Sequence, residues 1–214
     1  MNLDYLFRRP DRVLEFTRQH VELTLLALAL ALAVAIPLGI AAARFPRLSG
    51  PVLAILGAVY TVPSLAALAF LIPSLGIGRL PAVLVLAAYA QLFLVRNIVA
   101  GLRGVDAATL EAASGMGMTP WQVFAKVRWP LALPVMMAGL RTAAVTTISL
   151  ATVAAWIDAG GLGTLLFEGI TRDDPNRILA GTVAIAGLAL ATDGLLRLAQ
   201  RLTAADRARH AAAR

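Results

Sequence analysis

Five long apolar runs divide this chain into candidate membrane spans. They cover residues 23–43, 48–78, 80–95, 131–156 and 178–196, and only Arg141 and Asp193 interrupt them. A helix rises 1.5 Å per residue, so about 20 apolar residues cross a hydrocarbon core of about 30 Å. The pattern predicts an all-α multi-pass membrane protein with five transmembrane helices.

Proline and arginine residues set the expected limits of three spans. Pro63 stands inside the second run, which predicts a helix over about 52–72 that is bent at this proline. Arg96 is expected to end the third span. A mid-bilayer arginine is costly, so the fourth span is expected to begin near Gly139, with residues 131–140 at the interface and Arg141 reaching the inner surface or loop carbonyls.

The charges between the spans predict the orientation. The side with loop 96–130 and the carboxyl terminus has eleven Lys and Arg residues and three Asp and Glu residues. The other side has seven basic and eight acidic residues. Because cytoplasmic loops are the more basic ones, the amino terminus is expected outside and the carboxyl terminus in the cytoplasm. The expected organisation is an external segment 1–20, a transmembrane domain 21–200 and a basic cytoplasmic tail 201–214 that contacts anionic membrane lipid.

A competing interpretation makes the first 43 residues a signal peptide with Arg8 and Arg9 as its basic region. Its apolar run is longer than the 7–15 residues of such a peptide, and the leader before it contains four acidic residues. A transmembrane helix is therefore favoured.

Composition supports a membrane protein and excludes several kinds of site. Apolar residues make up 59% of the chain and charged residues 14%, against about 45–50% apolar residues in soluble domains. The net charge of +7 is explained by topology, so no nucleic-acid partner is expected. The chain has no cysteine and two separated histidines, so we expect no metal site and no catalytic site.

The longest polar interruption, residues 104–130, predicts two short helices joined by glycines. Asp106 is a suitable N-cap for the first helix, which Gly115 and Gly117 would stop. Thr119 is a suitable N-cap for the second, with Pro120 at its first position. An apolar stripe at spacing three follows, made of Trp121, Phe124 and Val127.

This loop resembles the cytoplasmic signature of the permeases of type I ATP-binding-cassette (ABC) importers. That signature reads Glu-Ala-Ala, three residues, Gly, nine residues, an aliphatic residue, one residue, Leu and Pro. The matching residues here are Glu111, Ala112, Ala113, Gly117, Val127, Trp129 and Pro130, with Trp129 in place of leucine.

Further segments resemble permeases for glycine betaine, choline, carnitine and related osmoprotectants. They are residues 60–65, 71–78, 96–97, 101–106, 159–163 and 178–181. Gln91, Phe93 and Asp158 depart from the pattern of these relatives. A permease of the same type for another small solute, such as an amino acid, stays open as the alternative.

The resemblance implies a multi-pass permease in the bacterial plasma membrane that couples to a separate cytoplasmic ABC ATPase. The residues implied in coupling are Glu111, Ala112, Ala113, Gly115, Gly117 and Pro130. ATP and magnesium belong on the ATPase, because this chain has no Gly-x-x-x-x-Gly-Lys loop. The other implied partners are a second permease, identical or paralogous, and an extracytoplasmic substrate-binding protein that docks on or near the outer loop from Asp158.

Two groups of residues are candidates for the translocation path. The first lies at the proline bend and contains Tyr60, Thr61, Pro63 and Ser64; the second is a mildly polar face of the fourth span with Thr142, Thr146, Ser149 and Thr152. The alternatives are a kink that only shapes packing and hydroxyls that bond to their own helix backbone. Asp193 and Arg197, four residues apart, are expected to pair with each other.

Two other protein classes fit the sequence less well. An ion-coupled secondary transporter or channel usually has ionisable groups near the bilayer midplane, and no carboxylate is expected there. An intramembrane enzyme would need a cluster of catalytic residues, and the chain has no His-Glu-x-x-His motif.

Overall fold

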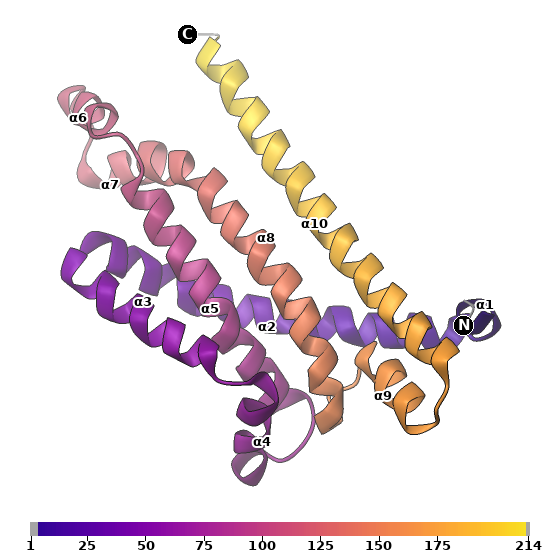
Figure 1. Ribbon diagram of the computed structural model, residues 1–214. Helices are drawn as coiled ribbons and strands as arrows, with labels where there is room; N and C mark the ends of the chain where they lie inside the picture. The colour runs from indigo at the N-terminus through magenta and orange to yellow at the C-terminus, as the bar shows by residue number, and fades with distance from the viewer. Residues whose placement is uncertain (1–3, 213–214) are drawn as a thin grey trace.

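The computed structural model describes residues 4–212, and the side chains of residues 5–201. Every regular element of this part is a helix, which confirms the all-α expectation (Figure 1). The helices are α1 (Asp4–Arg8), α2 (Pro10–Arg44), α3 (Pro46–Thr61), α4 (Ser64–Leu75), α5 (Arg79–Arg103), α6 (Ala107–Gly115), α7 (Pro120–Val123), a π-helical turn (Phe124–Arg128), α8 (Trp129–Ala154), a 3₁₀ turn (Ala155–Ile157), α9 (Gly163–Thr171) and α10 (Pro175–Ala212). Most side chains of the basic tail, 202–214 with His210, lie outside the described part.

The described helices supply four spans, or five if a bent pair is counted as one span. The four single spans are α2, α5, the continuous segment Pro120–Ile157 and the segment Pro175–Arg201 of α10. Helices α3 and α4, of 16 and 12 residues, are long enough only together, and they are bent by 90° at the break between them. This agrees with the five spans expected from the sequence.

The second span is broken at Pro63, not bent within one helix. Val62 and Pro63 both have extended backbone, with ψ of 131° and 127°. Proline lacks an N–H group and disfavours helical backbone at the residue before it, so α3 ends at Thr61. The Tyr89 hydroxyl of α5 donates to the Val62 carbonyl, which stabilises the broken form. The expectation of a single helix over 52–72 is therefore wrong.

Two helices extend beyond the expected span limits. Helix α5 continues through Arg96 to Arg103, and α8 runs from Trp129 without a break at Gly139. The α5 extension is anchored because the Arg103 guanidinium donates to the Ala42 carbonyl at 2.8 Å, at the carboxyl end of α2. Helix α8 tolerates Arg141 because its charge has a partner on α10.

Helices α2, α5 and α8 form the packed centre of the molecule. Small side chains there are almost fully buried, including Ala31 on α2, Ala90 on α5 and Ala143 on α8. Alanine lets helices approach closely, which is the usual basis of helix association in lipid. Helix α6 lies at one end of the molecule, together with the carboxyl-terminal end of α10, whereas α4 and α9 lie at the opposite end (Figure 1).

Candidate functional site

Helix α6 is a short, separately capped element in the 104–130 loop. The Asp106 carboxylate accepts from the Thr109 backbone N–H at 3.1 Å and from its hydroxyl at 3.2 Å, as expected of an N-cap. The helix ends at Gly115, and Gly117 has a φ of +81°, a conformation that favours glycine. The Met118 N–H then donates to the Ala113 carbonyl at 3.3 Å, which closes the helix end.

A continuous helical path joins this loop to the fourth span. Thr119 and Gln122 form a reciprocal capping box at the start of α7, with bonds of 2.8 Å and 3.3 Å. The Phe124 ring lies 5.8 Å from the Trp121 ring and 5.9 Å from the Trp129 ring, across the π-helical turn. The loop is thereby joined to α8 by continuous helix and by a row of three aromatic rings.

The exposed side of α6 carries one charge among small residues. Glu111 and Ala112 are exposed, as are Gly115 and Gly117, whereas Ala113 is buried against its own chain. Pro130 is half-buried at the start of α8. Two large apolar side chains in the same loop, Met116 and Trp121, are each 72% exposed. Neither was expected from the sequence to contact another protein. Exposed large apolar groups beside one another are the signal that marks such a surface.

The proline break gathers aromatic rings from two helices. Tyr60 lies 5.7 Å from the ring of Tyr89 and 5.2 Å from the ring of Phe93, both on α5. Thr61 donates to the Ala58 carbonyl of its own helix at 2.7 Å. Thr61 and Pro63 are exposed and Ser64 is half-buried, so all four predicted residues stand at one bend; the two rings of α5 were not predicted to join them.

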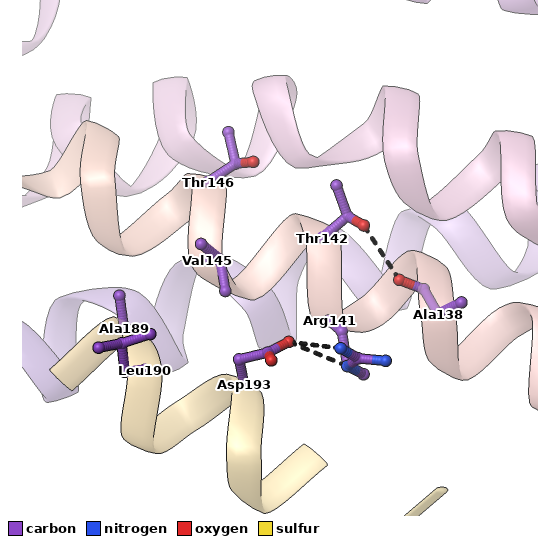
Figure 2. A pocket seen from close by; sticks show the side chains of 8 residues that line it. All are labelled: Ala138, Arg141, Thr142, Val145, Thr146, Ala189, Leu190 and Asp193. Carbon is purple, nitrogen blue, oxygen red and sulfur yellow. Dashed lines mark hydrogen bonds and ion pairs between the residues drawn. The ribbon is translucent and has the colours of Figure 1, made fainter. Parts of the chain in front are cut away.

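A cavity of about 430 Å³ lies between α8 and α10 (Figure 2). Its lining residues are Ala138, Arg141, Thr142, Val145, Thr146, Ala189, Leu190 and Asp193. Of the four predicted hydroxyl residues of α8, only Thr142 and Thr146 belong to this lining. Thr142 donates to the Ala138 carbonyl at 3.2 Å, and Ser149 likewise donates to the Val145 carbonyl at 3.0 Å. Thr152 is half-buried near the carboxyl-terminal end of α8.

An ion pair joins the two helices at this cavity. Two guanidinium nitrogens of Arg141 contact one Asp193 carboxylate oxygen, at 2.8 Å and 3.0 Å, and the two side chains point toward each other (Figure 2). The other oxygen accepts from Arg197 at 3.0 Å, which confirms the expected Asp193–Arg197 pair. Arg141 thus bonds to side chains of α10 and not to the loop carbonyls that were one of its two expected partners. The sequence signal that could have predicted the Arg141–Asp193 pair is the presence of two opposite charges inside separate spans, because each charge lowers the cost of burying the other.

The amino-terminal part of α2 and the carboxyl-terminal part of α8 are joined through the glycine-rich loop before α9. His20 is fully buried and its ring bridges two backbone groups: Nε2 contacts the Ile148 carbonyl at 3.0 Å, and Nδ1 accepts from the Leu162 N–H at 3.2 Å. Gln19 accepts from the Gly161 N–H at 3.0 Å. Asp158, at the start of this loop, is exposed.

No group of three or more metal-ligating side chains occurs within the described residues. Two acidic residues in and after α9 have other contacts: Glu168 pairs with Arg177 at 2.7 Å and with Arg12 at 3.3 Å, and Asp174 accepts from the first-turn N–H groups of α10.

Comparison with known proteins gives a consistent result. The family model described as "Binding-protein-dependent transport system inner membrane component" matches residues 35–204. A carnitine transport permease of Listeria monocytogenes, OpuCB, is 45% identical over 87% of this chain and 86% of its own length. A choline transport system permease of Bacillus subtilis, OpuBB, is 39% identical over 93% of this chain and 92% of its own length. An osmoprotectant import permease of Salmonella typhimurium, OsmW, is 38% identical over 92% and 94%.

Solved structures agree with this at the level of fold. A chain of the inward-facing MetNI methionine ABC transporter matches with a TM-score of 0.79 and 20% identity, covering 95% of this chain and 99% of its own. A chain of an amino acid ABC transporter solved with histidines matches with a TM-score of 0.77 at 16% identity, covering 94% and 98%.

Proposed function

The chain belongs to the family of binding-protein-dependent transport system inner membrane components, and we propose that it carries quaternary ammonium osmoprotectants such as glycine betaine, choline and carnitine. It is a multi-pass inner-membrane permease of the ABC importer type. The observation that carries the substrate class is 38–45% identity, over nearly the whole chain, to permeases named for carnitine, choline and osmoprotectants. The amino-acid alternative has support only from structures at 16–20% identity, which share the fold.

In this proposal α6 docks in a groove of a separate cytoplasmic ATPase that holds ATP and magnesium. The exposed Glu111 pairs with a basic groove residue, and the small Ala112 and Gly115 let the two backbones approach. Met116 and Trp121 supply apolar contact area around this charge. The continuous path from α7 into α8 then converts movement of the ATPase into movement of a span.

Two more partners complete the importer. A second permease, identical or paralogous, covers the outward face of α10, whose most apolar stretch is only 11% buried in the single chain and exposes Gly187 and Ala191. A substrate-binding protein docks at the end that carries α4, α9 and the loop from Asp158, with the amino terminus outside. The bend residues Tyr60, Thr61, Pro63 and Ser64 and the α8 hydroxyls of Thr142, Thr146, Ser149 and Thr152 line the path between the two permeases.

Co-purification and uptake together test this function. The tagged chain, extracted in mild detergent from its own host, is expected to bring down an ATPase and either no other permease or one distinct paralogue. Deletion of the gene is expected to reduce uptake of labelled glycine betaine, choline or carnitine at high osmolarity. Unchanged uptake of all three would contradict the substrate class, and recovery of the chain alone after crosslinking would contradict the ATPase docking.

Charge reversal at Glu111 tests the coupling step. We expect Glu111→Lys to leave the protein in the membrane and to lower uptake by about tenfold or more, because like charges then face each other in the groove. Asp11→Lys is the matched control, since Asp11 is also an exposed carboxylate but lies in the first turn of α2, away from α6. Normal transport by the Glu111 variant would contradict the coupling role.

A further inference from the structure

The cavity between α8 and α10 combines charge, hydroxyl groups and apolar surface, and the proposed translocation path includes only its two threonines, Thr142 and Thr146. Resting on the proposed function, we propose that this cavity binds zwitterionic osmoprotectants in passage, with Arg141 as the ligand of their carboxylate. Its volume of about 430 Å³ falls within the usual range for small-molecule sites, about 300–1,000 Å³.

The charge cluster has room for one more negative group. Arg141 and Arg197 share the single carboxylate of Asp193, so these three side chains carry a net charge of +1. Side-chain exposure is 22% at Arg141 and 27% at Asp193, against 54% at Arg197, so solvent compensates charge less well at the Arg141–Asp193 pair than at Arg197. A bound carboxylate balances the excess positive charge.

One guanidinium nitrogen of Arg141, a residue that lines the cavity, makes no contact with Asp193. Its Nε and Nη2 atoms contact Asp193, whereas its Nη1 donates to the neutral amide oxygen of Gln200 at 3.3 Å. A charged acceptor forms a shorter and stronger hydrogen bond than an amide oxygen. Exchange of Gln200 for a solute carboxylate therefore needs no break in the Arg141–Asp193 pair.

The remaining lining suits the other half of such a solute. Val145, Ala189 and Leu190 offer apolar contact for the methyl groups of a quaternary ammonium, and Asp193 offers a nearby negative charge. Glycine betaine and carnitine carry both a trimethylammonium group and a carboxylate, whereas choline has the same cation and a hydroxyl. Because only the zwitterions have a carboxylate for Arg141 to bind, the site distinguishes them from choline.

The test compares two solutes in the complete importer. The double variant Arg141→Met with Asp193→Leu removes both partners of the part-buried pair, a replacement that is often neutral for stability. It leaves only Arg197, whose side chain is 54% exposed, without its carboxylate. Initial uptake rates of labelled glycine betaine and choline are measured for wild type and variant in cells that lack the native gene. We expect the glycine betaine rate to fall about tenfold more than the choline rate, as the loss of a charge-assisted hydrogen bond implies.

A second variant and a matched control separate binding from structure. Arg141→Lys keeps the charge on Asp193 but loses the planar fork, and it is expected to lower the glycine betaine rate selectively even if the double variant folds poorly. The control is Arg177→Met with Glu168→Leu, an ion pair of similar side-chain exposure (15% and 25%) that does not line the cavity; it is expected to change both rates by the same factor.

The outcomes are distinct. An equal fall for both solutes in the Arg141 variants, or an unchanged glycine betaine rate, overturns the carboxylate site while choline uptake by the wild type still supports the proposed function. If the wild type transports neither solute, the proposed function fails, and the carboxylate site fails with it.

Discussion

The α6 loop and the cavity between α8 and α10 are built from hydrogen bonds of very different reach. In the loop, Asp106 bonds to Thr109 and Thr119 to Gln122, each three residues along the chain. At the cavity, Arg141 contacts Asp193 and Gln200, which are 52 and 59 residues away. The difference teaches that the α6 loop is locally determined, whereas the cavity exists only after two spans have packed.

Because of this contrast, substitutions in the two regions are expected to damage the protein in different ways. A change in the loop alters one short helix and leaves the buried contacts of α2, α5 and α8 in place. A change at the cavity alters the interface that holds α10 to the rest of the chain. Substitutions in the two regions are therefore expected to differ in both size and range of effect.

The largest effect is expected from loss of the Asp193 carboxylate. Asp193→Ala leaves Arg141 and Arg197 facing each other without a counter-charge in a part-buried position, so we expect a loss of about 2–3 kcal/mol in the free energy of unfolding. The loss is measured as a lower midpoint of thermal unfolding of the intact complex in mild detergent. The double variant Arg141→Met with Asp193→Leu is the control and should recover most of it. Wild-type stability of the single variant would show that the pair does not hold α10.

An intermediate effect is expected at Gly161, in the contact between the loop before α9 and α2. Gly161 has a φ of +85°, and a Cβ there would lie 2.9 Å from His20 Nδ1. Gly161→Ala therefore adds a clash with a buried ring to the cost of left-handed backbone, and we expect about 2 kcal/mol lower stability in the same thermal measurement.

Gly117 provides the matched comparison from the loop. Its φ of +81° is similar, but a Cβ there would meet nothing within 4 Å. Gly117→Ala is thus expected to cost only the backbone strain, about 1 kcal/mol. Equal losses at the two glycines would mean that the His20 contact adds nothing.

The smallest effect is expected at the N-cap of α6. Asp106→Ala removes the acceptor for the first turn, which costs about 1 kcal/mol of helix stability. Amide hydrogen exchange is expected to become about fivefold faster in residues 107–115, as that energy implies, and to stay unchanged in α8. Asp106→Asn is the control, because asparagine caps nearly as well. Faster exchange throughout α8 would show that the loop and the span are one cooperative unit.

Local features of both regions could be predicted from the sequence. The caps at Asp106 and Thr119, the helix stop near Gly115 and the location of the bend at Pro63 each depend on one residue and its immediate neighbours. The Asp193–Arg197 pair was predicted for the same reason, since residues four apart share a helix face.

Features that join distant segments could not be predicted in this way. The Arg141–Asp193 pair, the rings of Tyr89 and Phe93 beside Tyr60, and the buried His20 all depend on which helices become neighbours. The same reason explains why α8 begins before the limit expected from Arg141, because a charge inside a span is costly only until its partner is known.

The amino-acid sequence by itself determined the number of apolar spans, the loop between the third and fourth of them, and the residues that cap and stop α6. These properties follow from hydropathy, proline and glycine stereochemistry and hydrogen bonds within one helical turn. Only the tertiary structure decided where α5 and α8 begin and end, that a 90° break divides the second span, and that Arg141 meets Asp193 at a cavity. The physical reason is that burial cost and charge compensation belong to pairs of helices, and a pair is defined only once the chain has folded.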